Sequence, residues 1–284
     1  FMVNARAIAQ KDFKWDVSLN LSHSVKKFTE IYGGETYYGD YKVNDRFDDY
    51  YATVWQRNPE GKVIVDGTGQ PLRDPYQRKV GHANPDLRYG LQNVFKYKDF
   101  TLNVDFDGAI GGLIYSTLSP KLWWGGKHPN SVQYRDAEYA TGKPVYVPDA
   151  VVVTGGEVKY DINGNIVSDT RTYAPNKQAV DWQSWCQNYP YRAIVTDKMD
   201  KTFANTFNRS YLKLRYVALA YDFHRWLSKG SAVKGLVVTL FANNLALWSK
   251  APWIDPDISG DSDNNSGAAD PTARYVGMGV NIKF

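Results

Sequence analysis

The last stretch of the chain runs from Thr272 to Phe284, and apolar residues occupy every second position in it from Val276 onward. Successive side chains of a β-strand point to opposite faces, so this pattern predicts a strand with one apolar and one polar side. A closing strand that ends on an aromatic residue in the apolar register is typical of outer-membrane β-barrels. An ordinary edge strand at the end of a soluble domain shows the same alternation, so this stretch alone leaves both interpretations open.

Six further segments alternate in the same way, at about 1–9, 13–22, 87–97, 102–110, 211–223 and 235–248. Several are close to the ten or so residues that a tilted strand needs to cross a bilayer. On a barrel, the period of two predicts a lipid-facing set: Phe13, Trp15, Val17, Leu19, Leu102, Val104, Phe106, Val276, Val280 and Ile282. It predicts a lumen-facing set on the opposite side: Lys14, Asp16, Arg88, Asn103, Asp105, Asp107, Gly277 and Asn281.

The connections between these strands alternate between short and long. Residues 10–12, 98–100 and 224–234 form short or moderate turns, whereas 33–85, 117–209 and 250–271 form long loops. An antiparallel barrel produces this order when every long loop lies on the outer face of the membrane, and it places Phe284 on the periplasmic side. We therefore predict an all-β, antiparallel transmembrane barrel with long extracellular loops. Seven strands are too few to close one, so we expect the chain, which begins as if in mid-strand, to be part of a longer protein.

Composition narrows the classes of function. Aromatic residues make up 15% of the chain, with 21 Tyr and 9 Trp, which suits interfacial girdles or ligand-stacking surfaces. No run of about 18 apolar residues is present, so a transmembrane helix is excluded, but a mean hydropathy of -0.49 is compatible with barrel strands. The net charge of +4 is small and scattered, which disfavours nucleic acid as a partner. The single Cys186 excludes an internal disulfide.

Residues that could carry catalysis or bind a metal do not form a site in the sequence. Segments 161–165 and 261–265 offer oxygen ligands at alternate positions but lack the downstream Glu of an EF-hand loop, so we interpret them as solvated turns. Asp105 and Asp107 share one strand face, where acidic residues in a wet lumen need no catalytic role. The four histidines lie far apart without a Ser or Cys motif beside them. We therefore predict no enzyme activity, no catalytic residues, no cofactor and no metal.

The predicted outer loops are rich in aromatic residues. Such rings stack on sugars, anchor peptide side chains and form protein interfaces, but they also pack long loops against one another. We select eight of them as candidates for binding substrate or a partner: Trp123, Trp124, Tyr134, Tyr139, Trp182, Trp185, Tyr189 and Trp253.

Several short motifs carry a family resemblance. Asn84-Pro-Asp86 is followed by Tyr89-Gly-Leu91, then by the segment 95–100 and by the pair Gly111-Gly112. Tyr211-Leu-Lys-Leu214 comes later, and Asn243-Asn-Leu245 precedes Trp253-Ile-Asp-Pro-Asp257. In their order and spacing these pieces resemble SusC/RagA-type TonB-dependent outer-membrane transporters. The family usually has Glu at the position of Asp257.

The resemblance implies that residues 1–284 are the C-terminal part of a 22-stranded barrel whose N-terminal plug is absent from this chain. It implies import of oligosaccharides or oligopeptides across the cell outer membrane, with a SusD-like lipoprotein as partner and with energy supplied through TonB-ExbB-ExbD. It also implies that Phe284 is a signal for barrel assembly. The alternative that we keep open is a soluble or surface-attached β-sandwich module that binds carbohydrate or protein.

Overall fold

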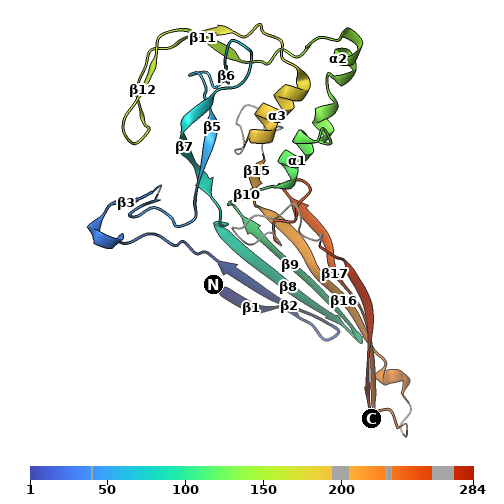
Figure 1. The fold of residues 1–284 in the computed structure, drawn as a ribbon. Helices are drawn as coiled ribbons and strands as arrows, with labels where there is room; N and C mark the ends of the chain where they lie inside the picture. The colour runs from blue at the N-terminus through green and yellow to red at the C-terminus, as the bar shows by residue number, and fades with distance from the viewer. Residues whose placement is uncertain (40, 194–204, 228–229, 231, 258–271) are drawn as a thin grey trace.

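A seven-stranded antiparallel sheet forms the body of the protein (Figure 1). The computed structural model describes residues 1–39, 41–193, 205–227, 230, 232–257 and 272–284. The strands follow one another in the order β1 (Met2–Ala9), β2 (Phe13–Ser22), β8 (Leu87–Tyr97), β9 (Phe100–Ile110), β16 (Tyr211–Asp222), β17 (Gly235–Ser249) and β18 (Tyr275–Lys283). All seven predicted strands are confirmed. Within the described residues, no helix has the length and apolar character that a membrane span requires.

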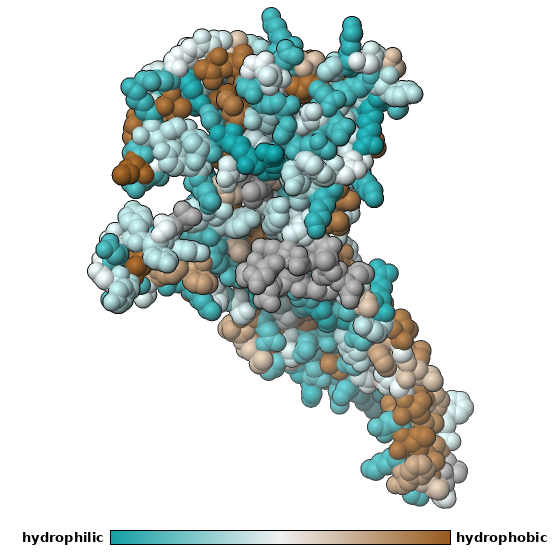
Figure 2. Space-filling model, viewed as in Figure 1, coloured by the Kyte–Doolittle hydropathy of each residue, from teal (hydrophilic) through white to brown (hydrophobic). Residues whose placement is uncertain are grey.

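The strand register keeps one face of the sheet apolar. Leu102 pairs with Leu219, Leu219 with Leu240 and Leu240 with Met278, which makes an apolar row across four strands. These side chains stay accessible, with Leu240 at 57% and Met278 at 65% exposure, and Figure 2 shows apolar residues gathered along the end of the sheet near the C-terminus. No second sheet packs on this row among the described residues. A sandwich with a conventional core is therefore the wrong interpretation.

One polar residue interrupts the apolar face. Asn93 pairs with Val17 and with Val104, so its side chain lies among apolar neighbours. Its Oδ1 accepts a hydrogen bond from Trp15 Nε1 at 3.2 Å, and its Nδ2 donates to the Val104 carbonyl at 3.1 Å. A buried amide is tolerated where its donors and acceptors are paired, which explains how this face accommodates a residue that breaks the alternation.

Short turns lie at one end of the strands and long loops at the other, as the sequence predicts (Figure 1). Next to the short turns, Phe13, Tyr97, Phe100 and Tyr221 are register partners across four neighbouring strands. The rings of Phe100 and Tyr221 lie 4.6 Å apart. A row of aromatic side chains at one end of barrel strands is the arrangement expected at a membrane interface.

The first long loop folds into small strands. It contains η1 (Tyr32–Gly34), β3 (Tyr37–Tyr38), β4 (Tyr41–Lys42), β5 (Asp49–Trp55), β6 (Ile64–Val65) and β7 (Arg73–His82). Strands β3 and β4 form a small hairpin, and β5 pairs with β7.

The second long loop is more regular than the sequence indicates. It contains β10 (Leu113–Tyr115), α1 (Leu118–Trp124), η2 (Pro129–Val132), α2 (Arg135–Thr141), β11 (Val151–Gly155), β12 (Val158–Tyr160), β13 (Ile166–Asp169), β14 (Thr172–Pro175), α3 (Trp182–Arg192) and β15 (Thr206–Asn208). Residues 117–209 show no regular alternation in the sequence, yet they form these helices and strands. A connection of this length needs a core of its own, and helices and strands supply paired backbone groups around that core.

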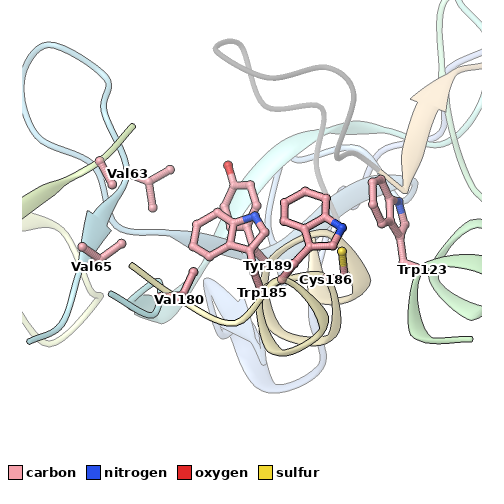
Figure 3. Close-up of a cluster of buried hydrophobic side chains, with 9 residues drawn as sticks. Val63, Val65, Trp123, Val180, Trp185, Cys186 and Tyr189 are labelled. Carbon is pink, nitrogen blue, oxygen red and sulfur yellow. The ribbon is translucent and has the colours of Figure 1, made fainter. Parts of the chain in front are cut away.

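The two long loops share one core, which we call the outer core (Figure 3). Its members are Val63, Val65, Trp123, Ala150, Val180, Trp182, Trp185, Cys186 and Tyr189. Strand β6 from the first loop pairs in parallel with β11 from the second, so Val63 and Val65 join the cluster that also contains the Trp side chains of α1 and α3. The outer loops therefore form one packed body above the sheet (Figure 1).

Candidate functional site

The motif residues that lie far apart in the sequence meet in space, first at the outer rim of β8 and β9. The backbone N–H of Asp86 donates to the Ile110 carbonyl at 2.8 Å. Gly111 and Gly112 follow with φ values of +80° and +74°, and a Cβ on either would collide with residues 83–86. Glycine adopts positive φ without strain and allows this close approach. The Asn84-Pro-Asp86 and Gly-Gly motifs are thus two halves of one tight junction.

A second meeting point is an ion cluster on the polar face of β16. Lys213 Nζ lies 2.6 Å from Asp255 Oδ2 and 3.1 Å from Asp257 Oδ2, and the lysine side chain is only 1% exposed. Arg215 Nη2 lies 2.6 Å from both Asp107 Oδ2 and Asp257 Oδ2. A buried charge is tolerated where it is paired and hydrogen bonded, and here each cation faces two carboxylates.

A β-bulge directs Arg215 into this cluster. The register between β16 and β9 shifts between Leu214 and Tyr216, so Arg215 is the extra residue. Opposite it, Asn244 adopts φ of +55°, a left-handed conformation that Asn tolerates better than most residues. Arg215 Nη1 donates to Asn244 Oδ1 at 3.1 Å, and Asn244 Nδ2 donates to the Ala273 carbonyl at 3.1 Å. The Asn-Asn-Leu motif therefore shapes the bulge that positions the arginine.

The cluster fastens the start of the third long loop to the sheet. Arg209 Nε donates to the Pro256 carbonyl at 3.2 Å, and Tyr211 Oη donates to Asp257 Oδ1 at 3.0 Å. Burial by itself would raise the pKa of the Asp257 carboxyl, but hydrogen bonds from Arg215 and Lys213 outweigh it and lower the pKa to about 2. Asp257 is therefore ionised across the physiological range and keeps both cations paired.

The predicted lumen residues lie on the face that holds this cluster. Arg88 and Asp107 line an open depression of about 450 Å³ together with Tyr211 and Asp257. Asn103 and Asp105 lie on the same face, nearer the short turns. Sequence reasoning selected Asp107 and Arg88 but missed Lys213, Arg215, Asp255 and Asp257. The signal that would have found them is the presence of charged residues inside the recurring motifs around 213 and 257.

The eight candidate loop aromatics divide into two groups. Trp123, Trp182, Trp185 and Tyr189 are buried in the outer core, so in this structure they pack the loops against one another. Trp124, Tyr134, Tyr139 and Trp253 are exposed, and Tyr139 reaches 93% exposure. The ring of Trp253 lies 5.0 Å from that of His128, which stacks on Trp123 at 3.8 Å. The third long loop therefore also contacts the outer core. Binding by the exposed group stays a prediction.

Burial shifts the pKa values of Cys186, in the outer core, and of His128, which stacks on Trp123 of that core. Burial lowers the pKa of His128 to about 4, and its Nδ1 accepts a hydrogen bond from the Asn130 N–H at 3.1 Å. Burial raises the pKa of the Cys186 thiol to about 12, so this cysteine is a neutral apolar group at physiological pH. Both groups are therefore structural in the uncharged form.

Of the two Asp/Asn-rich segments interpreted as solvated turns, 161–165 can be compared with the structure. Asp161 Oδ1 accepts hydrogen bonds from the backbone N–H groups of Asn163 and Asn165, which is the geometry of an ordinary turn. Segment 261–265 lies outside the described residues. Across the described ranges, no group of three or more His, Cys, Asp or Glu side chains is arranged to hold a metal ion.

Comparison with known proteins identifies the architecture. No family model matches the chain. The chain is similar over its whole length to TonB-dependent receptor P3 of Formosa agariphila, with 21% identity over 325 aligned positions that cover 28% of that protein. Over 40% of its length it is 23% identical to TonB-dependent receptor SusC of Bacteroides thetaiotaomicron, covering 14% of that protein.

Solved structures agree. All of the chain superposes on 28% of a chain in the RagAB peptide transporter, with a TM-score of 0.61 and 15% identity. A structure of the RagAB peptide importer in its closed-closed state gives a TM-score of 0.60 with 12% identity, covering all of this chain and 29% of that one. The chain thus resembles part of a SusC/RagA-like TonB-dependent transporter of the outer membrane, and its sheet has the fold of barrel wall. The family resemblance and the fold class predicted from the sequence are confirmed. The relatives are receptors and transporters rather than enzymes. Where the whole chain is matched, it spans 28–29% of the length of these proteins.

Proposed function

We propose that this chain supplies seven wall strands and three outer loops to an outer-membrane transporter that imports oligosaccharides or oligopeptides. The strands hold the wall in lipid, and the outer loops meet the nutrient and a SusD-like surface lipoprotein. Energy reaches the transporter through TonB-ExbB-ExbD by way of protein outside residues 1–284. Import of this kind needs binding and passage, without a chemical step on the nutrient.

The observation that carries the proposal is the division of the sheet into two faces. The apolar row from Leu102 to Met278 is accessible, whereas the opposite face holds the ion cluster of Lys213 and Arg215. A barrel wall between lipid and a wet lumen needs this division, and a soluble domain would leave the apolar row uncovered in water.

The partner follows from the outer loops. Their aromatic side chains exceed what closing a hairpin requires, and exposed aromatic residues are common anchors of protein interfaces. Trp124, Tyr134 and Tyr139 are exposed on the same loop, Trp124 at the end of α1 and the two tyrosines at the start and middle of α2. We assign this surface to capture of the lipoprotein, of the nutrient or of both.

The test is affinity purification of the complete protein from its native outer membrane, followed by native mass spectrometry. The proposal expects a co-purified lipoprotein and a bound oligosaccharide or oligopeptide, together with loss of nutrient uptake when the gene is deleted. Unchanged uptake of every oligosaccharide and oligopeptide tested in the deletion strain would exclude the import function. Recovery of the protein in the soluble fraction without detergent would exclude its place in the membrane.

A further inference from the structure

A cavity of about 370 Å³ opens in the outer loops, between α1 and α3. It is lined by Trp123, Trp124, Gly125, Gly126, Ser131, Arg135, Glu138, Asp181, Trp182, Gln183 and Cys186. These residues come from α1, the following turn, η2, α2 and the beginning of α3. The volume falls within the range of small-molecule sites. The cavity lies away from the ion cluster. It shares no lining residue with the depression that Arg88 and Asp257 line.

The floor of the cavity is rigid. Trp123, Trp182, Ser131 and Cys186 are buried and belong to the outer core or contact it directly. Trp182 Nε1 donates to the Ser131 carbonyl at 2.8 Å, and Ser131 Oγ donates to the His128 carbonyl at 2.7 Å. These bonds fix the indole of Trp182 and the turn beside it, so a ligand would meet a surface that is already formed.

The rim combines one open aromatic ring with polar groups. Trp124 is 52% exposed, its ring lies 4.9 Å from that of Tyr191, and its backbone carbonyl accepts a hydrogen bond from Gln187 Nε2 at 3.3 Å. Arg135 Nη2 donates to the Gly126 carbonyl and to Ser131 Oγ. Gln183 is exposed, and Asp181 accepts the Ser184 N–H through Oδ2 at 2.7 Å. Within the described residues, Nη1 of Arg135, Oδ1 of Asp181 and the amide of Gln183 have no hydrogen-bond partner.

The rim carries one cation, Arg135, and two carboxylates, Glu138 and Asp181. Both oxygens of Glu138 accept the Trp182 N–H, and Oε1 also accepts the Val145 N–H, so this carboxylate is engaged at the start of α3. That leaves the guanidinium of Arg135 and the carboxylate of Asp181 facing the cavity as one cation and one anion. A neutral ligand with several hydroxyl groups satisfies both, whereas a charged ligand would leave one of them opposed by a like charge.

We propose that this cavity is a saccharide-binding subsite of the outer loops. The apolar face of a sugar ring stacks on Trp124, and its hydroxyl groups bond to Arg135, Asp181 and Gln183. One recurring mode of peptide recognition adds the extended peptide to an open strand edge, and no cavity residue belongs to a strand. The inference rests on the proposed import function, and it selects glycan over peptide as the class that the outer loops contact first.

The experiment measures binding by isothermal titration to the complete protein purified in detergent. The probes are neutral oligosaccharides of glucose, mannose and xylose, six or seven residues long, with hexa-alanine as the peptide probe. The variants are Trp124→Ala and Gln183→Ala, and Trp124→Phe tests rescue by a smaller ring. Tyr139→Ala is the matched control, because Tyr139 is exposed on α2 but does not line the cavity.

The proposal expects at least one oligosaccharide to bind, with Kd raised about tenfold or more by Trp124→Ala, largely restored by Trp124→Phe and unchanged by Tyr139→Ala. Binding of hexa-alanine that depends on Trp124 would overturn the glycan assignment. Failure of every oligosaccharide, or binding indifferent to both cavity variants, would overturn the subsite. Migration of unheated protein on a denaturing gel reports the folded barrel in the same samples, so loss of the subsite and failure of the proposed membrane function give different results.

Discussion

Lys213 on β16 and Asp255 on the third long loop form an ion pair whose Nζ and Oδ2 atoms are 2.6 Å apart. The pair joins a wall strand to a loop across 42 residues of sequence, and the lysine is almost completely buried. Removing one partner of such a pair leaves a charge that is desolvated and uncompensated. The ion pair is therefore one of the contacts that hold the start of the third loop on the sheet, beside the buried Pro256.

Lys213→Met should lower the free energy of unfolding by about 3 kcal/mol, because Asp255 would keep its charge without its cation. It should also speed proteolytic cleavage near residues 250–257. The control is Lys62→Met, which removes an exposed pair with Asp149 and should change stability far less. Thermal unfolding in detergent and limited proteolysis measure both effects. Equal behaviour of the two variants would show that the ion cluster does not hold the loop.

Leu240→Arg should destabilise the assembled barrel by about 2–4 kcal/mol if the side chain lies near the bilayer midplane, and by less near an interface. Leu240 lies in the apolar row between Leu219 and Met278. The neighbouring Thr239→Arg places the same charge on the opposite face, where water solvates it, and should cost much less. Unfolding in lipid vesicles compares the two. A larger penalty at Thr239 would reverse the assignment of the faces.

Phe284→Asp should reduce the amount of assembled barrel far more than it reduces transport per assembled molecule. Phe284 follows β18 and is exposed beyond its last paired residue, Lys283. An aromatic side chain there anchors at the membrane interface, and the resemblance implies that the assembly machinery reads it. The measurement compares surface-detected with total protein in cells. Assembly at the wild-type level would leave Phe284 as an interfacial side chain alone.

Deleting residues 125–200 should weaken capture of a SusD-like lipoprotein in a pull-down. The deletion removes α2 and α3 with the exposed Tyr134 and Tyr139, and it also opens the outer core. Tyr139→Asp is therefore the companion variant, because this exposed change leaves the core intact. If both variants capture as much lipoprotein as the unchanged protein, the loops do not bind this partner and instead gate the substrate or pack against one another.

The outer core should lose stability as pH falls from about 6.5 to 4. His128 has a native pKa of about 4, below its ordinary value of 6.5, because burial disfavours the charged ring. Between these values the unfolded segment binds a proton that the folded segment does not, so the free energy of unfolding falls by up to about 3 kcal/mol and is level above pH 6.5. Hydrogen exchange of α1 and α3 measures this. His128→Asn should remove most of this dependence of stability on pH. His224→Asn, which changes an exposed residue at the short-turn end of the strands, should leave the dependence unchanged.

The wall of this protein was predictable because its information is local. A strand in a wall one layer thick has apolar residues at every second position. This alternation can be read directly from the sequence at 13–22 and at the end of the chain. Turn residues state where each strand ends. Asn93 is the exception to this alternation. Its hydrogen-bond partner Trp15 is 78 residues away, so no local pattern predicts their contact.

The outer loops and the ion cluster were not predictable in the same way. Trp123, Trp124, Trp182 and Trp185 look alike in the sequence, yet packing from distant strands such as β6 buries three of them and leaves Trp124 open at a cavity. The charges of Lys213 and Asp257 likewise acquire a role when the chain returns and brings them within 3.1 Å. Burial and ion pairing depend on neighbours far along the chain, so they follow from the folded arrangement, whereas alternation along a strand depends on adjacent residues alone.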